Sequence, residues 1–518
     1  MIYLAEITAY NLTTSTVETL RYSTGTGYVD TVNGTYYEPR IEQPCLMRRD
    51  IFNSGKIGGT TTSSYGELTL KNIDGGLDIF SGYAFDGRTV TLKVGEPNDA
   101  YSTFTTVLIA GVAQAAFEWQ RVSIRLRDRI TDLQKKKVQP LLFAGTNDNI
   151  SIFNEGGTDL KDAQKPMIYG RVTNLTPVLI NSFYLLYQIS TSAIAEVVNV
   201  FDKGAYLARG SDYATSALLR ASSPALGAFN TCLAEGMIKL GSTPTGTITV
   251  VVWQYKTIED NTVAQIVKRI VTSSGGLTTS DLVLADYTTL DSQIAANVGL
   301  VVSSDMMVSD VLDTLCESIG AWWGFDSLNK FRILRLDAPS STSVADFDES
   351  SIMSIERESV SVNSSTDAVY KITLEHDKNW TVQTGDSLAS SVAADHKSYL
   401  ERVSVGKENK KDVRQSVKKD DSIKTAHPNA QEITISTLLC GLKYAEPEAQ
   451  RLLSIYDPSR IILTVSVKVD ASILSAVDLG NVVKVTSSRY GLSSGKYLRV
   501  IGIQTDFENN KLDLKLWG

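Results

Sequence analysis

The chain has 518 residues, which is too many for one ordinary hydrophobic core, so we expect three or four domains. Hydrophobic residues make up 42% and charged residues 21% of the sequence, and these proportions exclude a disordered chain as the default. The net charge of −8 and the isoelectric point of about 5.2 disfavour a protein that grips duplex nucleic acid, because such proteins carry a basic face.

Residues 1–140 are predicted to form an N-terminal β-domain. Apolar and polar side chains alternate along 90–94 and 122–126, and this period of two places one face of each strand in a core and the other in water. Turn-forming residues, such as Asp-Gly-Gly at 74–76, separate these stretches. Short strands at regular spacing indicate a barrel or a sandwich.

Residues 141–260 are predicted to form a second, inserted β-rich domain. The lysine cluster 135–137, followed by Pro140, marks the edge before it and is interpreted as a solvated turn. The clearest strands are 185–189 and 247–253. The second of these has apolar residues in succession, which is typical of a strand buried on both faces.

Residues 261–339 are predicted to form a small α/β domain with the clearest helices of the chain. Apolar residues recur between positions 263 and 271 at the three- and four-residue spacing of one helix face. Asn261 can cap the start of this helix, and the glycines at 275–276 can end it.

A second helix is predicted over residues 308–319 from the same spacing. Ser304 is its expected N-cap and Gly320 its expected stop. Cys316 lies in the apolar pattern of this helix and is interpreted as a small core residue. Residues 322–336 then predict a β-hairpin that turns at 326–329.

Residues 340–518 are predicted to form a C-terminal β-domain, which follows a Ser/Thr-rich linker. A short helix is expected at 445–456. The closing β-meander has predicted strands at 482–486, 497–507 and 511–517, the last two joined by a turn at Asn509 and Asn510. Residues 401–424 hold eight basic and five acidic side chains with few large apolar groups, so we expect a mobile polar loop there, with a basic contact patch as the alternative.

The four cysteines, Cys45, Cys232, Cys316 and Cys440, are scattered and form no Cys-x-x-Cys pair. A disulfide framework or a zinc site is therefore not expected, and reduced thiols are. The first residues lack the basic and apolar regions of a signal peptide. The longest mostly apolar run, 107–117, is shorter than the ~20 residues that span a bilayer, so we expect no membrane-spanning segment and synthesis in the cytoplasm.

Candidate catalytic residues are few. The three histidines, His376, His396 and His427, fall in polar stretches, and none has the spacing of a helical zinc site. Residues 491–495 match the Gly-x-Ser-x-Gly nucleophile elbow, but that elbow needs a helix after its serine, and here a strand is expected. Ser493 is therefore interpreted as a loop residue.

Other candidate sites lack essential members. Residues 55–57 read Gly-Lys-Ile, where a phosphate-binding loop needs Ser or Thr after the lysine. Asp74 and Asp78 flank glycines without the ligand ladder of a calcium loop, which favours a turn. Glu446 and Glu448 are expected at an exposed helix start, where carboxylates favour the dipole. We predict no catalytic residue, no metal ligand and no cofactor.

Several segments resemble, in the same order, hub proteins of long-tailed bacteriophages and gene transfer agents. These segments are Lys165–Val172, Thr176–Ile180, Leu186–Gln188, the unit 262–336, the helix Ala445–Tyr456, Asp478–Val483, Arg489–Leu492, Arg499–Ile503 and Leu512–Gly518. Together they touch most of the chain, and it resembles the tail-tip or baseplate hub family.

The resemblance implies a structural virion protein, multidomain and mainly β with a small α/β domain, built from tube-like β-barrels. It implies a ring, commonly a trimer, at the tail tip or baseplate. The implied partners are the tail tube or a distal tail protein, the tape measure protein, and central fibre or receptor-binding proteins. DNA would pass through its channel without specific binding, which suits the acidic charge. The family has no catalytic residues to carry over, so we expect no enzyme.

Two other functions stay open. The 22 tyrosines, if they lie on β-surfaces, would suit a receptor-binding or carbohydrate-binding tail protein, although ordinary half-buried strand packing is the favoured interpretation. The third function is a cell-wall hydrolase, because the two carboxylates of a glycosidase can be distant in the sequence.

Overall fold

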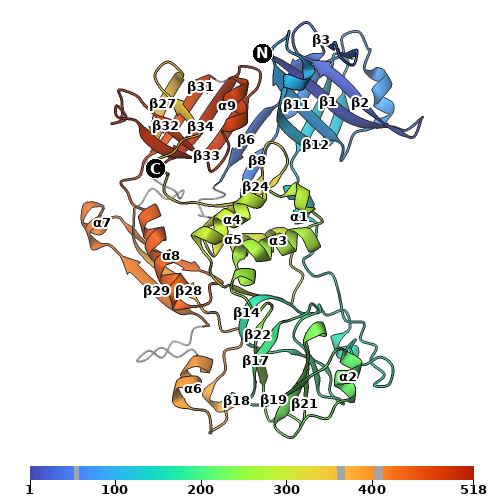
Figure 1. Cartoon of the computed structure of the whole chain (residues 1–518), viewed down its shortest axis with the longest axis vertical. Coiled ribbons are helices and arrows are strands. Elements are labelled where there is room, and N and C mark those ends of the chain that lie inside the picture. Colours follow the sequence, from blue (N-terminus) through green and yellow to red (C-terminus); the bar gives the residue numbers. More distant parts are fainter. Residues whose placement is uncertain (52–57, 359–367, 402–411, 469) are drawn as a thin grey trace.

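The computed structural model describes residues 1–51, 58–358, 368–401, 412–468 and 470–518. The chain is mainly β-structure with a small α/β part, and this confirms the predicted fold class. Figure 1 shows the N-terminal β-domain (blue) and the C-terminal β-domain (red) side by side at one end of the long axis. A layer of helices lies in the middle, and the inserted β-rich domain (green) lies at the other end.

The N-terminal β-domain is built on a curved antiparallel sheet with the order β10-β1-β11-β12-β13-β9-β5, in which β2 also pairs with β1. Its strands are β1 (Ile2–Asn11), β2 (Thr16–Ser23), β5 (Ile41–Gln43), β9 (Glu67–Lys71), β10 (Tyr83–Ala84), β11 (Thr89–Gly95), β12 (Thr105–Phe117) and β13 (Arg121–Arg127). The predicted alternation is confirmed in β11 and β13, where every second side chain is buried. A hairpin of β3 (Tyr28–Asp30) and β4 (Thr35–Tyr37) adds a smaller apolar cluster beside Ile2 and Leu4.

One segment of this domain leaves its sheet and pairs with two other parts of the chain. It consists of β6 (Leu46–Asp50), β7 (Gly59–Thr60) and β8 (Thr62–Ser64). β6 pairs antiparallel with β33 (Lys496–Asp506) of the C-terminal sheet, and β8 pairs with β6. β7 pairs parallel with β24 (Ala321–Phe325) of the α/β unit. The predicted division into domains did not anticipate this crossing.

The inserted domain contains sheets with the orders β18-β17-β22-β14-β23 and β15-β16-β21-β20-β19. Their strands are β14 (Met167–Leu175), β15 (Val178–Asn181), β16 (Leu186–Gln188), β17 (Glu196–Asp202), β18 (Ala205–Tyr206), β19 (Ala208–Asp212), β20 (Ala228–Cys232), β21 (Met237–Leu240), β22 (Ile248–Trp253) and β23 (Gly299–Val302), with the helix α2 (Ser216–Ala221). β22 lies between β17 and β14 and is buried over its first five residues, as its apolar run predicted. β23 comes from beyond the predicted boundary at residue 260, so the two middle domains share a sheet.

The α/β unit contains the predicted helices and hairpin (Figure 1). Its helices are α1 (Ile130–Gln134), α3 (Val263–Ser273), α4 (Leu284–Gln293) and α5 (Val308–Glu317), and its sheet has the order β25-β24-β7, with β25 at Phe331–Arg335. The apolar stripe of α3 is buried, and Cys316 of α5 lies in the same core, which confirms both predictions.

The predicted N-cap of α3 is wrong by one residue. The hydroxyl of Thr262 accepts the backbone N–H of Gln265 at 3.3 Å and so caps the helix. The Asn261 amide instead donates to the carbonyls of Tyr255 and Thr257, at 2.7 and 2.6 Å. Thr262 has the role because it directly precedes the helix with the extended backbone of an N-cap.

The predicted start of α5 is also wrong, because Met307 and not Ser304 precedes the helix. The carbonyl of Lys136 accepts the N–H of Val308 at 2.8 Å, and this backbone bond replaces a side-chain cap. The Lys136 amine donates to the carbonyl of Gly275 at 2.7 Å, just beyond the end of α3. The cluster 135–137 is therefore not only a solvated turn, because Lys136 makes hydrogen bonds at the end of α3 and at the start of α5.

The C-terminal β-domain has a sheet with the order β26-β32-β33-β34-β31-β27, to which β6 and β8 are added. Its elements are β26 (Ala345–Phe347), β27 (Ile352–Glu358), β31 (Ile462–Lys468), α9 (Ala471–Ala476), β32 (Val482–Val485) and β34 (Lys511–Trp517). The predicted meander of β32, β33 and β34 is confirmed, and Asn510 has a φ of 51° in its turn.

The part of the chain that follows β27 and precedes β31 in the sequence forms a smaller sheet, which packs on the α/β unit. Its order is β29-β28-β30. The elements of this part are β28 (Val369–His376), α6 (Ala394–Glu401), β29 (Arg414–Lys419), α7 (Asp421–Ala426), β30 (Gln431–Ser436) and α8 (Leu442–Ile455). Side chains of β28 and α8, such as Ile372 and Leu452, join the core of α3 and α5. The hydrophobic core of the α/β unit thus contains residues from both sides of the predicted boundary at residue 340.

The second half of the segment 401–424 forms a strand and a helix, whereas the sequence predicted a polar loop. Residues 402–411 lie outside the described residues. Beyond them, β29 pairs with β28, and α7 follows. β29 lies at the edge of its sheet, so backbone hydrogen bonds and an ion pair of 2.6 Å between Lys418 and Glu446 of α8 hold it without a large apolar side chain.

Candidate functional site

Ser493 occupies the position that the sequence predicted. It is exposed in the turn between β32 and β33, so a strand and not a helix follows it. The strand–serine–helix geometry of a nucleophile elbow is therefore absent at this turn.

The three histidines lie on different elements. His376 is buried at the end of β28, with its Nδ1 3.0 Å from Asp377 Oδ2. His396 of α6 stacks on Tyr206, with ring centroids 5.3 Å apart. His427 is exposed just after α7. Over the described ranges of the chain, no cluster of three or more His, Cys, Asp or Glu side chains could hold a metal ion.

The Asp74 and Asp78 carboxylates stabilise a turn, as predicted. Asp74 accepts two hydrogen bonds from Arg40, at 2.7 and 2.8 Å, and these hold the pKa of Asp74 well below its usual range. Asp78 accepts from Asn72 at 2.7 Å. The glycine–lysine pair within 55–57 lies outside the described residues.

The four cysteines are all buried, and the Cys440 thiol donates to the carbonyl of Arg171 at 3.4 Å. Burial raises the pKa of Cys45 to about 12, so this thiol stays protonated at neutral pH. Among the described residues, no helix has the length and apolar character needed to cross a membrane.

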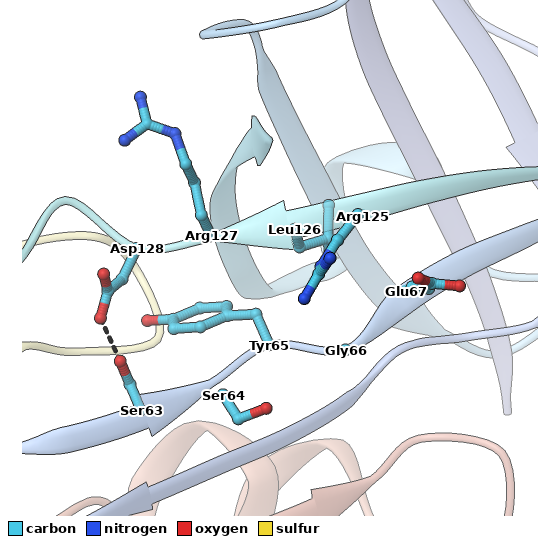
Figure 2. A pocket seen from close by; sticks show the side chains of 9 residues that line it. All are labelled: Ser63, Ser64, Tyr65, Gly66, Glu67, Arg125, Leu126, Arg127 and Asp128. Carbon is cyan, nitrogen blue, oxygen red and sulfur yellow. Dashed lines mark hydrogen bonds between the residues drawn. The ribbon is translucent and has the colours of Figure 1, made fainter. Parts of the chain in front are cut away.

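A polar pocket of about 500 Å³ opens between β13 and the segment that joins β8 to β9 (Figure 2). Its lining residues are Ser63, Ser64, Tyr65, Gly66, Glu67, Arg125, Leu126, Arg127 and Asp128. The Ser63 hydroxyl donates to the Asp128 carboxylate, and the Tyr65 hydroxyl is directed toward this pair. Burial raises the pKa of Asp128, although the bond from Ser63 opposes it. The pocket offers hydrogen bonds to a polar partner, but no histidine lines it.

A buried ion cluster lies where three domains meet, and we call it the three-domain ion cluster. Arg49 of β6 donates to Asp478, which precedes β32, at 2.5 Å. Arg332 of β25 lies 3.7 Å from the other oxygen of Asp478 and 2.5 Å from Asp286 of α4. The Arg49 side chain is only 3% exposed. The N-terminal segment, the C-terminal β-domain and the α/β unit each contribute to this cluster.

The charges of this cluster depend on one another. Burial lowers the pKa of Arg49, but the Asp478 carboxylate together with Tyr65 and Asp326 outweighs this effect, so the pKa is raised overall. Burial raises the pKa of Asp286, which Arg332 opposes. Arg49 is neutralised by Asp478 from another domain, so separating these two domains would leave both charges without this partner. The cluster therefore serves to hold the domains in position.

A second ion cluster corrects the prediction for Glu448, which is not on an exposed helix start. Its side chain is 1% exposed and accepts from Arg335 of β25 and, at 2.6 Å, from Arg451 of α8. Arg451 also lies 3.2 Å from Asp337, whose carbonyl accepts from Arg499 of β33 at 2.8 Å. Glu448, Arg335, Arg451, Asp337 and Arg499 thus join α8, the α/β unit and the C-terminal sheet.

A sequence signal for this second cluster exists. Glu448 stands three residues after Ala445 and four before Leu452, on the buried stripe of α8. Arg335 continues the buried phase of Phe331 and Ile333 in β25. A charged residue at a core position indicates a buried partner, and this rule would have singled out both residues.

No family model and no curated protein matches the sequence. The chain is similar to the solved tail protein from Neisseria meningitidis MC58, with a TM-score of 0.42, 10% identity and coverage of 100% of this chain and 96% of that chain. It is similar to the 43 kDa tail protein of prophage MuSo2 from Shewanella oneidensis, with a TM-score of 0.39, 10% identity and coverage of 93% and 95%. A third similar chain belongs to the virion of a native gene transfer agent particle, with a TM-score of 0.42, 11% identity and coverage of 73% and 86%.

Proposed function

We propose that this chain is a structural, non-enzymatic part of a phage or phage-like tail, at the tip or baseplate hub where the tube meets the receptor-binding machinery. The observation that carries the proposal is the pairing of β6 with β33, which holds the two outer β-domains side by side within one chain (Figure 1). The ordered resemblance of its sequence segments to hub proteins supports it.

Two β-domains in one chain suit an adaptor between rings of different symmetry. Three copies would place six β-domains around an axis, which fits a sixfold tube on one side and a threefold tip on the other. Closed rings use heterologous interfaces, in which each subunit presents two different surfaces. We therefore propose a cyclic trimer that contacts the tail tube or a distal tail protein, the tape measure protein, and central fibre or receptor-binding proteins.

The proposed ring encloses a channel through which DNA passes. A basic lining would hold DNA through its phosphates, so the lining should be polar and not strongly basic. The net charge of −8 agrees with this requirement. Lysine substitutions at acidic lining positions should slow genome ejection without blocking tail assembly.

Electron microscopy of intact tails, with this chain located in the density, tests the proposal. The expected result is three copies around the axis, with both β-domains of each copy beside an open channel. A single copy on the axis or a sixfold ring of this chain would overturn the hub assignment. A position on a peripheral fibre would overturn it in favour of the receptor-binding alternative.

A further inference from the structure

A short segment, residues 59–66, touches three domains, and we call it the crossing strap. Its strand β7 pairs with β24 of the α/β unit, and the Thr61 amide donates to the carbonyl of Trp323 at 2.9 Å. Its strand β8 pairs with β6, which extends the C-terminal sheet. The carbonyl of Gly66 accepts from the amide of Leu126 in β13 of the N-terminal sheet at 3.1 Å. Releasing the crossing strap would therefore loosen the contacts among these domains.

Two carboxylates hold the crossing strap to its neighbours. Asp313 of α5 accepts hydrogen bonds from the Thr60 hydroxyl and the Trp323 indole, each at 2.8 Å. Asp128, which follows β13, accepts from the Ser63 hydroxyl, and Figure 2 shows this bond beside the polar pocket. All three donors are uncharged. The strap is thus held by carboxylates that its own donors do not neutralise.

The surroundings of Asp313 also lack a compensating charge, because it forms no ion pair within the described ranges of the chain. The titratable side chains that act on it from its own helix are all acids, namely Asp310, Cys316 and Glu317. The strap and β24 face it with the hydroxyl and the indole only. Burial is the largest effect on this carboxyl, and it raises the pKa of Asp313.

The charges around Asp128 compensate it only in part. Arg127 lowers the pKa of Asp128, but its guanidinium pairs with Asp132 at 2.8 Å, and the Asp132 charge raises that pKa. Three further polar side chains line the same pocket, Tyr65, Glu67 and Arg125. Burial is again the largest effect, and the pKa of Asp128 is raised overall. Because the pocket opens to solvent, protons can reach this carboxyl.

A carboxyl with a raised pKa affects stability in one direction. Its contribution is fully present below the unfolded-state pKa of about 3.9 and is lost as the pH rises through the folded-state pKa. A protonated carboxyl still accepts a hydroxyl hydrogen bond through its carbonyl oxygen. An ionised one is half-buried without a cation, which costs free energy. The contacts of the strap with both carboxyls are therefore strongest in acid.

We propose that the crossing strap is a pH-sensitive device, which holds the N-terminal sheet and the α/β unit together more firmly in mild acid than at neutral pH. Asp313 holds one end of the strap and Asp128 the other, so ionisation of both weakens the same segment. The domain contacts then loosen first at the strap as the pH rises. This inference does not depend on the proposed function, because it concerns the free chain.

Hydrogen exchange of the strap peptide measures its opening, after correction for the pH dependence of the intrinsic exchange rate. In the wild-type chain, the protection of strap amides such as Thr61 should fall at least about threefold between pH 4.5 and pH 7.5. Asp128→Asn and Asp313→Asn keep the shape and the acceptor oxygen of a protonated carboxyl but cannot ionise. The double variant should therefore be as protected at pH 7.5 as the wild type is at pH 4.5.

Glu67→Gln is the matched control, because Glu67 lines the same pocket but is exposed. This variant should keep the pH dependence of the wild type. An unchanged pH dependence in the double variant, or its loss in Glu67→Gln, would overturn the proposal. Lower protection of the double variant than of the wild type at pH 7.5 would also overturn it, because the predicted change is a gain that misfolding cannot imitate.

Discussion

Replacing Arg49 by methionine would test whether the three-domain ion cluster holds the outer β-domains together. Methionine keeps most of the apolar volume and removes the guanidinium that donates to Asp478 at 2.5 Å. Breaking a buried ion pair by removing one partner costs about 3–5 kcal/mol. Asp478 is 20% exposed and keeps Arg332 at 3.7 Å, so we expect the lower end, about 3 kcal/mol.

The neighbouring residue provides the matched control. Arg48 lies on the same strand but on its other face, where its side chain is 63% exposed and pairs with Asp50 at 2.8 Å. Exposed pairs contribute at most about 1 kcal/mol, so Arg48→Met should change the stability little. The two variants remove the same charge from adjacent positions and differ mainly in burial.

Hydrogen exchange of the β6 amides that bond to β33 measures the effect locally, because strand β6 must separate from β33 for these amides to open. A loss of about 3 kcal/mol corresponds to roughly 150-fold faster exchange of these amides in Arg49→Met. The β33–β34 hairpin, whose own pairing is untouched, should change much less. Equal exchange of β6 in Arg49→Met and the wild type, or an equal effect of Arg48→Met, would refute the reasoning.

Three further outcomes are expected. Glu448→Gln should lower the stability of the chain to urea by about 3 kcal/mol, because it leaves buried arginines without their carboxylate. The matched variant at the exposed Glu446, Glu446→Gln, should cost less than about 1 kcal/mol. Equal losses in the two variants would contradict the buried cluster. Asp313 of α5 accepts hydrogen bonds from the Thr60 hydroxyl and the Trp323 indole, each at 2.8 Å, and burial raises its pKa. Its contribution to stability is therefore full below a pH of about 4 and is lost as the pH rises through the folded-state pKa. The stability of Asp313→Asn to urea should therefore rise relative to that of the wild type between pH 4 and pH 7, and a parallel pH profile would contradict this. Ser493→Ala and alanine variants of the three histidines should leave infectivity nearly unchanged, with no clearing of cell wall in a zymogram by any form; a large loss with normal assembly would support an enzyme.

The elements that the sequence predicted well are those that local periodicity determines. α3 carries its apolar stripe within eleven residues, and β33 and β34 alternate around a short turn. Helix α4 was missed because its pattern is weak, with only Asp286, Tyr287 and Leu290 buried. A helix with so narrow a buried face is stabilised by its tertiary contacts more than by its own pattern.

The crossing of β6 could not be predicted from its own residues. Met47 and Arg49 alternate with exposed neighbours, which indicates a strand but not its partner. That partner, β33, lies more than four hundred residues later in the sequence. Arg49 at a core position indicates a buried carboxylate partner. The sequence does not say which aspartate this partner is, because only the fold brings Asp478 close to Arg49.

The structure fixes the angle between the outer β-domains by independent means. β6 extends the C-terminal sheet, and the Arg49 cluster anchors the same strand to the α/β unit. On the other side, Arg499 and Arg451 bind the chain at 336–338, where the α/β unit passes into the C-terminal domain. In a closed ring the rotation between neighbouring subunits must add up to a full turn, so a variable angle within each subunit would prevent closure or give several ring sizes. In the proposed ring, a chain that contributes two β-domains would need them to be rigidly joined, and buried charges suit this role because alternative domain angles would leave them without partners.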